Sequence, residues 1–400
     1  MRSARSKPLE GVRVLEFCEF AAGPFAGSLL ADLGADVVKV ERPDRGDGLR
    51  KWPPFSRDGE GEPYSEGFAS INRNKRSVIA NLKDQQDVAR LRRLCSECHV
   101  LIENFRPGVL SRHGLSYQTL AAENEQLVYC SVTGYGQSGP YASRGAFDVT
   151  VQAASGVMSV TGEPDGQPVK CGVPFGDFCA GLYASYSILA SVMQARETGK
   201  GVYIDCSMVG SLMGVSALQT SEFFGTGRAP LKLGSAHPRN APYQAFRGRD
   251  RYFVLAAGTD RFWAEVCDAV GEPNLVNDPR FSSVELRAKN QKELVEVLEP
   301  LFESQVAEHW LGEMIRRGVP CSPINTYAEA LSNPQIEYMD LVVDLELPNG
   351  ERTKTIAFPV SISGFQFEVF RTPPRLGEHT DEVLSEWVKG SGKKNARSCR

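Results

Sequence analysis

The chain lacks any excess of positive charge. Its 400 residues carry 45 Lys and Arg against 49 Asp and Glu, which gives a net charge of −4 and a pI near 5.9. This balance argues against a nucleic-acid partner, because nucleic-acid-binding domains present basic surfaces. Long apolar runs are also missing, and we expect no segment of the roughly 20 residues that cross a membrane. The basic residues 1–7 lack the apolar core of a secretory signal and are expected to form a short disordered leader.

A disulfide framework is missing as well. The ten cysteines are scattered along the chain, which favours free thiols in a reducing compartment. Cys95, Cys98 and His99 match the CxxCH pattern of haem attachment, but the segment is expected to join a helix to a strand. No second CxxC or paired His follows at a zinc-like spacing, so we predict no metal. The expected location is the cytoplasm, or the mitochondrial matrix if the leader is the remnant of a transit peptide.

What the sequence does contain is a repeated alternation of strands and helices. Residues 11–17 and 36–41 are expected strands on either side of a helix over 25–33, which Gly34 ends. A unit of this size implies parallel strands and a right-handed crossover. Further expected elements continue the alternation: strands at 77–81, 100–103, 127–132 and 202–206, and helices at 86–95 and 178–196. The predicted fold is therefore α/β, with an open, doubly wound, Rossmann-like sheet.

Two glycine-rich stretches do not meet the requirements of nucleotide-binding motifs. Residues 134–139 fit GxGxxG, but a loop follows where a dinucleotide site needs a helix, so a dinucleotide oxidoreductase is disfavoured. Residues 198–201 lack P-loop spacing and are expected to form a turn. Residues 225–241 are rich in Gly and Pro and are expected to be a linker. The organisation along the chain is thus a large domain over 8–224, the linker, a smaller α/β domain over 242–328, a return to the large domain over 329–388, and a disordered tail over 389–400.

Asp177 is the first candidate for chemistry. It follows Pro174 and Gly176 and opens the apolar helix expected over 178–196. Unpaired N–H groups and the helix dipole favour a charged carboxylate there. A partly desolvated carboxylate can attack an activated acyl group. Because Asp is also a good N-cap, a purely structural role is the alternative.

With these pieces in place, the chain resembles the class III CoA-transferases, the CaiB/BaiF type that includes formyl-CoA transferase and α-methylacyl-CoA racemase. The matching stretches are 8–16, 22–24, 30–42, 74–77, 103–108, 134–137 and 176–177. The region 242–328 is most similar to the succinate–glutarate branch. The resemblance implies a CoA-binding large domain, and two ring-shaped subunits interlocked in a homodimer. Acyl-CoA and small carboxylic acids would be substrates, without a permanently bound cofactor.

The resemblance also implies roles for individual residues. Asp177 falls at the nucleophile, which would carry an aspartyl anhydride and then an aspartyl-CoA thioester. Positions matching the family's CoA contacts are Phe20, Ala22, Arg42, Ala80, Lys83, Asn104, Phe105 and Arg112. Positions matching its acyl site are Trp52, Tyr64, Phe147 and Asp148. Taken singly, each of these cations could be a solvated surface charge and each aromatic a core residue.

Differences between this sequence and two branches of the family disfavour some of the reactions that the family catalyses. The racemase has His where this chain has Phe147, so one of the two proton-transfer groups that racemisation needs is missing. Formyl-CoA transferase has a glycine run that is absent between 225 and 256, which disfavours formate and oxalate. We therefore expect a short dicarboxylate, with Arg239 or, alternatively, Arg73 offsetting the desolvation of its second carboxylate. Racemisation and CoA binding without chemistry remain the rival functions.

Overall fold

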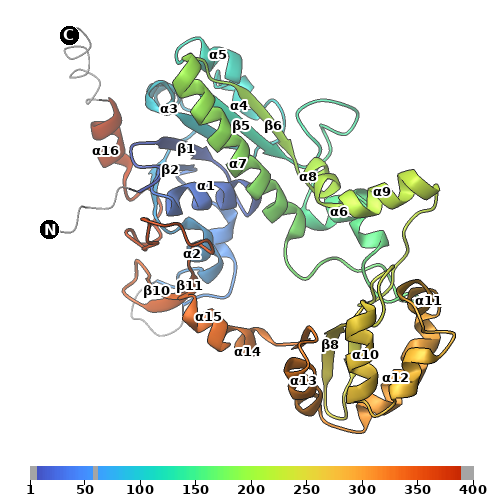
Figure 1. The fold of residues 1–400 in the computed structure, drawn as a ribbon. Coiled ribbons are helices and arrows are strands. Elements are labelled where there is room, and N and C mark those ends of the chain that lie inside the picture. The colour runs from blue at the N-terminus through green and yellow to red at the C-terminus, as the bar shows by residue number, and fades with distance from the viewer. Residues whose placement is uncertain (1–6, 57–61, 389–400) are drawn as a thin grey trace. The chain divides into compact units, whose positions relative to one another are not determined.

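The computed structural model describes residues 7–56 and 62–388, which form two compact units (Figure 1). The first unit comprises Met1–Val157, Lys170–Gly227 and Gln335–Arg400, and the second comprises Met158–Val169 and Arg228–Pro334. The excursion at Met158–Val169 falls inside the range expected for the large domain, and no local pattern in the sequence signals it. The expected tail and all but Lys7 of the leader lie outside the described residues.

Six parallel strands form the sheet of the first unit, in the order β3-β2-β1-β4-β5-β6. Their bounds are β1 Arg13–Phe17, β2 Asp36–Glu41, β3 Lys75–Ile79, β4 Val100–Glu103, β5 Val128–Thr133 and β6 Tyr203–Ser207. β1 pairs with both β2 and β4, so the sheet winds outward in two directions from this point. The observed topology confirms the predicted doubly wound α/β class.

Helices cover both faces of this sheet, because successive strand residues point to opposite sides. Val14 and Val37 belong to the core on one face, with α1 and α7, while Leu15 and Val38 belong to the core on the other face, with α3. These helices are α1 Ala22–Asp32, α3 Gln85–Glu97 and α7 Phe175–Thr198. Burial on both faces explains why the strands are almost continuously apolar.

Shorter elements join and flank this framework. Between β2 and β6 they are η1 Gly48–Lys51, α2 Glu66–Asn72, α4 Val109–Arg112, α5 Tyr117–Ala121, α6 Asp148–Ala154 and η2 Val157–Ser159. After β6 come α8 Met208–Val215 and α9 Ala217–Thr226, and the C-terminal part adds α15 Pro334–Tyr338, β10 Val342–Glu346, β11 Arg352–Ile356, α16 Thr380–Val383 and η4 Leu384–Val388.

α7 is long and apolar enough, by length and composition alone, to cross a membrane. The sequence expectation that no segment reaches this length was therefore wrong. The core helix of a soluble protein passes the same test, and Ala180, Ala184 and Ile188 of α7 lie in the core against the sheet. The opposite side of α7 exposes Leu182, and with it Tyr186, to solvent.

A buried ionic network fixes the start of the sheet. Lys39 Nζ lies 3.0 Å from Glu16 Oε1 and 2.8 Å from Asp47 Oδ2, and Lys75 Nζ lies 2.8 Å from Glu16 Oε2. All four side chains are fully buried, so each charge depends on its partners. Asp47 Oδ1 also accepts the backbone N–H of Phe20 at 3.0 Å, which ties the loop after β1 to this network.

The C-terminal segment returns to the first unit, as its contacts show. The His379 N–H donates to the Ser77 carbonyl at 2.9 Å, and Trp387 Nε1 donates to Asp36 Oδ2 at 3.0 Å. Arg76 pairs with Glu382 at 2.9 Å. Residues more than 300 positions apart in sequence therefore share one core.

The second unit has a core of its own. Its three-stranded antiparallel sheet has the order β7-β8-β9, with β7 Tyr243–Arg247, β8 Tyr252–Ala256 and β9 Cys321–Pro323. Its helical elements are α10 Asp260–Ala269, η3 Pro273–Asn277, α11 Val284–Lys289, α12 Gln291–Glu303, α13 Ala307–Arg316 and α14 Tyr327–Leu331. α11 and α12 are separated at Asn290, whose φ of −102° and ψ of 31° leave helical geometry.

Candidate active site

Asp177 lies in the first turn of α7, but it is not the N-cap. Pro174 occupies the cap position, and no side chain caps this helix by a hydrogen bond. A larger residue than Gly176 would crowd α6, since a Cβ there would lie 3.0 Å from Val151 Cγ2 and 3.1 Å from Asp148 Oδ1. The structure therefore gives Asp177 no capping bond that would account for it, and the structural alternative loses its basis.

The pKa of Asp177 is raised from its ordinary value of 3.8 to about 7. Burial is the main cause, and the nearby charge of Asp148 adds to it. The start of the helix favours the charged form, as expected, but burial and Asp148 raise the pKa in spite of it. Near neutral pH the carboxyl group is poised between its acid form and its nucleophilic form.

A chain of hydrogen bonds holds the segment that presents Asp177. Asp148 Oδ1 accepts the N–H of Gly176 at 2.7 Å, and Asp148 Oδ2 accepts from Gln152 Nε2 at 2.6 Å. Gln152 is fully buried, and its Oε1 accepts the N–H of Cys171 at 2.8 Å. Both ends of the segment 171–176 are thus fastened to α6, and we call Asp148 and Gln152 the α6 clamp.

A cavity of about 550 Å³ opens beyond the carboxyl ends of β1 and β4, the neighbouring strands at which the strand order reverses. Open α/β sheets bind ligands at such a switch point, beyond the carboxyl ends of the strands. Its lining includes Glu19, Phe20, Arg42, Asn81, Leu82, Lys83, Asn104, Phe105, Arg106, His113, Tyr135, Arg144 and Phe147. Phe147 directly precedes Asp148, so the cavity reaches the helix that clamps the Asp177 segment.

The structure brings six of the predicted positions to this cavity: Phe20, Arg42, Lys83, Asn104, Phe105 and Phe147. Two others, Ala22 and Ala80, are buried and do not line it. Arg112, at the end of α4, is exposed and also lies outside the lining. Trp52 packs on Phe20, with ring centroids 5.4 Å apart, and thereby borders the cavity without lining it.

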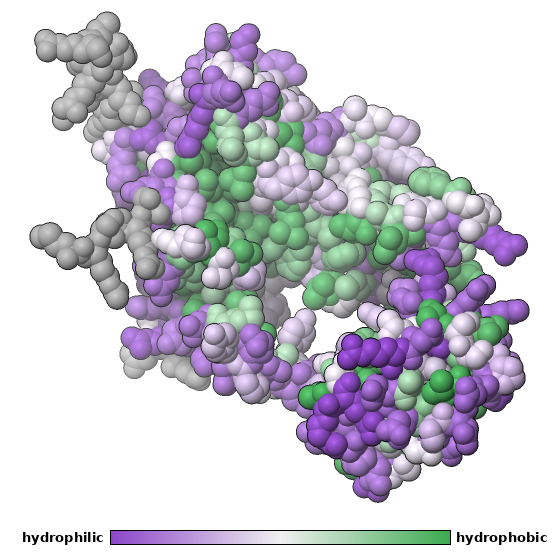
Figure 2. Space-filling model, in the orientation of Figure 1, coloured by the Kyte–Doolittle hydropathy of each residue, from purple (hydrophilic) through white to green (hydrophobic). Residues whose placement is uncertain are grey.

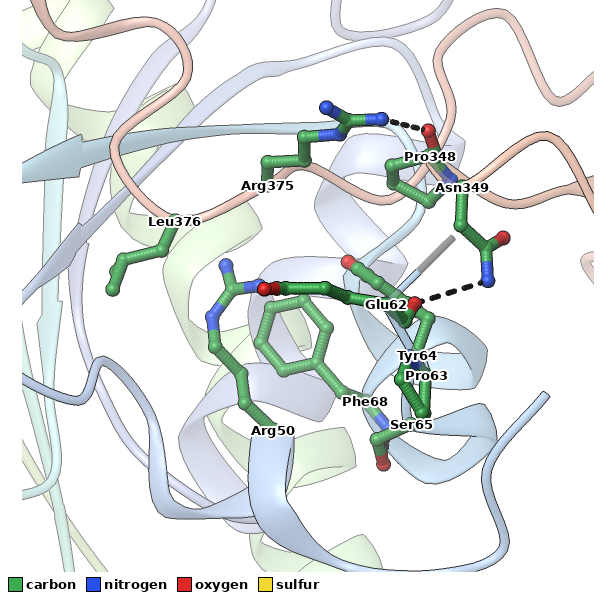
Figure 3. A pocket seen from close by; sticks show the side chains of 10 residues that line it. All are labelled: Arg50, Glu62, Pro63, Tyr64, Ser65, Phe68, Pro348, Asn349, Arg375 and Leu376. Carbon is green, nitrogen blue, oxygen red and sulfur yellow. Dashed lines mark hydrogen bonds between the residues drawn. The ribbon is translucent and has the colours of Figure 1, made fainter. Parts of the chain in front are cut away.

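Tyr64 lines a different cavity, of about 470 Å³, with Arg50, Phe68, Asn349 and Arg375 (Figure 3). Its hydroxyl donates to the carbonyl of Pro374 at 2.8 Å, and burial raises its pKa. Figure 3 shows the Arg50 side chain lying along the ring of Phe68. Tyr64 is therefore part of the packing between α2 and the C-terminal segment.

The two candidate cations for a dicarboxylate differ in their surroundings. Arg73 is buried and pairs with Asp32 at 2.5 Å, and it also donates to Thr355 Oγ1. Its guanidinium is committed to the protein and is not available to a substrate. Arg239 belongs to the second unit, where it is exposed and its N–H donates to His237 Nδ1 at 3.1 Å.

Several residues of the site escaped the sequence analysis. Glu19, Arg106 and Arg144 line the cavity, and Gln152 completes the α6 clamp. Arg106 lies inside the 103–108 stretch of the family resemblance, so that match could have indicated it. Gln152 could have been indicated only by its spacing of four residues from Asp148, one helical turn.

Nowhere in 7–56 or 62–388 do three or more His, Cys, Asp or Glu side chains form a group that could hold a metal ion. Cys95 and Cys98 of the CxxCH pattern are buried thiols, and burial raises the pKa of Cys98 to about 12. Neither thiol is exposed for attachment to a haem.

Comparison with known proteins decides the family. The model of CoA-transferase family III matches residues 9–380. The chain belongs to this family. The human succinyl-CoA:glutarate CoA-transferase is 38% identical over 384 residues, which cover 96% of this chain and 86% of that protein. The acetyl-CoA:oxalate CoA-transferase of Acetobacter aceti is 38% identical over 392 residues, covering 96% and 97%.

A solved structure supports the same assignment. The crystal structure of a CaiB/BaiF family protein from Brucella suis matches with a TM-score of 0.85 and 38% identity, covering 95% of this chain and 99% of that one. The family resemblance and the α/β class predicted from the sequence are therefore confirmed. The protein is a CoA-transferase, and acyl-CoA thioesters are its substrates.

Proposed function

We propose that Asp177 is the nucleophile of this CoA-transferase. Its position in the first turn of α7, at the end of a segment that the α6 clamp holds, supports the proposal, and Phe147 of the cavity lining leads directly into α6. An Asp177 oxygen attacks the thioester carbonyl of the donor, the C–S bond breaks, and CoA leaves as a thiolate. The product on the enzyme is a mixed anhydride between Asp177 and the donor acid.

The remaining steps return CoA to a new acid. The thiolate attacks the Asp177 carbonyl of the anhydride, which releases the donor carboxylate and leaves an aspartyl-CoA thioester. The acceptor carboxylate then attacks this thioester and expels the thiolate. The thiolate finally attacks the acceptor's carbonyl in the second anhydride, which gives the new acyl-CoA and restores the Asp177 carboxylate. No redox or metal cofactor takes part in these exchanges.

CoA is proposed to occupy the cavity at the switch point. Arg42, Lys83, Arg106 and Arg144 give it a strongly cationic lining that suits phosphate groups. The acyl end would point past Phe147 toward Asp177. In this arrangement Asp148 serves to hold the nucleophile's segment, since two protein N–H donors already use its carboxylate oxygens.

A short dicarboxylate is the proposed acid substrate. Relatives named for glutarate and for mesaconate support this class. Because another relative is named for oxalate, oxalate belongs in the substrate test even though the sequence disfavours it. Arg239 is the proposed partner of the second carboxylate, as Arg73 is already committed to Asp32. The test compares the rate of CoA transfer from succinyl-CoA with that from butyryl-CoA, in the wild type and in Arg239→Ala. A wild type that prefers butyryl-CoA would exclude a dicarboxylate substrate. A variant that keeps a preference for succinyl-CoA would exclude only the role of Arg239.

We also propose that the active protein is a homodimer with interlocked rings. Leu182, Tyr186 and Met193 are 52%, 56% and 72% exposed on one side of α7, opposite its buried side. Phe223 and Phe224 on α9 are further exposed apolar side chains, and Figure 2 shows hydrophobic residues on this face of the first unit. A second copy is the proposed cover. Cytoplasmic location, with the matrix as alternative, stays a proposal consistent with the free thiols.

The nucleophile is tested with Asp177→Ala. The variant should lose CoA transfer between succinyl-CoA and glutarate, and incubation of the wild type with donor and hydroxylamine should modify Asp177, as peptide mass spectrometry would show. Asp381→Ala is the matched control, because Asp381 is also an acidic residue in the first turn of a helix of this unit. Near-normal turnover by Asp177→Ala would exclude the mechanism.

A further inference from the structure

The cavity at the switch point contains an unexpected negative charge. Arg42, Lys83, Arg106 and Arg144 line it, and Glu19 is the one acidic side chain among its described lining residues. A site for a polyanion gains nothing from an acid of its own, since like charges disfavour binding. The position of Glu19 therefore needs an explanation.

Glu19 neutralises one of the cations. Arg42 Nη2 donates to Glu19 Oε1 at 2.7 Å and to Oε2 at 2.9 Å. Arg42 Nε is buried and has no hydrogen-bond partner in the described part of the chain, so the guanidinium retains an unused donor. Neither Lys83 nor Arg106 pairs with a carboxylate among the described residues, and both charges remain open to a ligand.

Hydrogen bonds on both sides of Glu19 hold its backbone in place. The N–H of Glu19 donates to Asn104 Oδ1 at 2.9 Å, and Asn104 Nδ2 donates back to the Glu19 carbonyl at 2.7 Å. The next residue, Phe20, is held by Asp47 with a φ of +63°, a left-handed conformation that the surrounding contacts must maintain. A ligand that takes over Arg42 would displace the Glu19 carboxylate by rotation of its side chain.

We propose that Glu19 is a resident counter-anion of Arg42, which a phosphate group of CoA displaces, and that this exchange sets the affinity of the enzyme for CoA. The inference rests on the proposed binding of CoA in this cavity. Burial raises the pKa of Glu19 in spite of its pair with Arg42, which is consistent with a carboxylate that is incompletely compensated in its present place. The free enzyme thus keeps Arg42 ordered, and binding must break the pair.

Calorimetric titration of the full chain with CoA and with pantetheine, which has no phosphate, tests this exchange. Glu19→Gln should bind CoA about threefold more tightly, the range expected for one partly exposed ion pair. Glu19→Ala, which removes the acceptor, should do so as well. The affinity for pantetheine should not change. Glu123→Gln is the matched control, because Glu123 pairs with Arg92 on the exposed surface away from the cavity.

Each outcome has a distinct meaning. Unchanged or weaker CoA binding by both Glu19 variants would overturn the counter-anion role and would show that Glu19 positions Arg42. An equal gain for pantetheine, or for Glu123→Gln, would also overturn it, because neither involves the exchange of a carboxylate for a phosphate at Arg42. Failure of the wild type to bind CoA would instead refute the proposed placement of CoA, and this inference with it.

Discussion

Asp148→Asn should shift the pH dependence of CoA transfer toward acid. The pKa of Asp177 is about 7, and the negative charge of Asp148 is one of its two causes. Removing a neighbouring like charge lowers a carboxyl pKa by about one unit. At pH 6 the ionised fraction of Asp177 should then rise from about 10% to about 50%, whereas at pH 8 it hardly changes.

The assay is kcat/KM for succinyl-CoA between pH 5 and 9, with each profile normalised to its value at pH 8. The wild type should lose activity as the pH falls through about 7, since the nucleophile is protonated there. Asp148→Asn should be about fivefold more active than the wild type at pH 6 on this normalised scale. Glu103→Gln is the control, because burial also raises the pKa of Glu103 to about 7 and its removal should leave the inflection in place.

The pH dependence of the stability of the free protein gives an independent check on the raised pKa of Asp177. The folded pKa of Asp177 exceeds its ordinary value, so the folded state holds a proton that the unfolded state releases between about pH 4 and pH 7. The ionised group therefore costs stability above pH 7, by at most about 4 kcal/mol. Asp177→Asn should raise the Tm at pH 8 and leave it nearly unchanged at pH 4. A flat wild-type activity profile together with no gain in Tm would refute the reasoning.

Three further predictions concern the surroundings of the site. Gln152→Leu should lower kcat more than it raises KM and destabilise the fold by about 1–3 kcal/mol, measured by urea unfolding, because the half-buried Cys171 N–H loses its acceptor. Arg42→Ala should raise the apparent KM for acyl-CoA, by up to about tenfold, whereas Arg112→Ala should have little effect, since Arg112 lies outside the cavity lining. Lys39→Met should destabilise the protein by about 3–5 kcal/mol, because the carboxylates that it pairs with stay buried.

Local sequence patterns were enough to predict the sheet and the position of its cavity. Short apolar segments alternating with helices specify parallel strands, and the carboxyl ends of parallel strands meet at one edge. Arg42 follows β2 and Asn104 follows β4, so their meeting in one cavity needed only the strand order. The local pattern was sufficient here because the residue that follows each parallel strand lies at the carboxyl edge of the sheet.

The surroundings of individual site residues could not be predicted, because they depend on contacts between distant parts of the chain. Tyr64 donates to the carbonyl of Pro374, and Arg73 donates to Thr355, partners some 300 positions away that no local pattern indicates. The pKa of Asp177 illustrates the same limit. Its place in the helix favours the anion, but the burial of α7 and the approach of α6, which tertiary structure alone provides, favour the acid.

The separation of charges in the first unit fits the proposed division between CoA binding in the cavity and attack on the thioester by Asp177. The cations of the cavity lie beyond the strand ends, whereas no Lys or Arg in the described part of the chain forms an ion pair with Asp177. A cation beside Asp177 would lower its pKa and, with it, the nucleophilicity of the carboxylate. In the proposed arrangement, the binding energy of the CoA phosphates would bring the thioester to a carboxylate that no counter-charge has weakened.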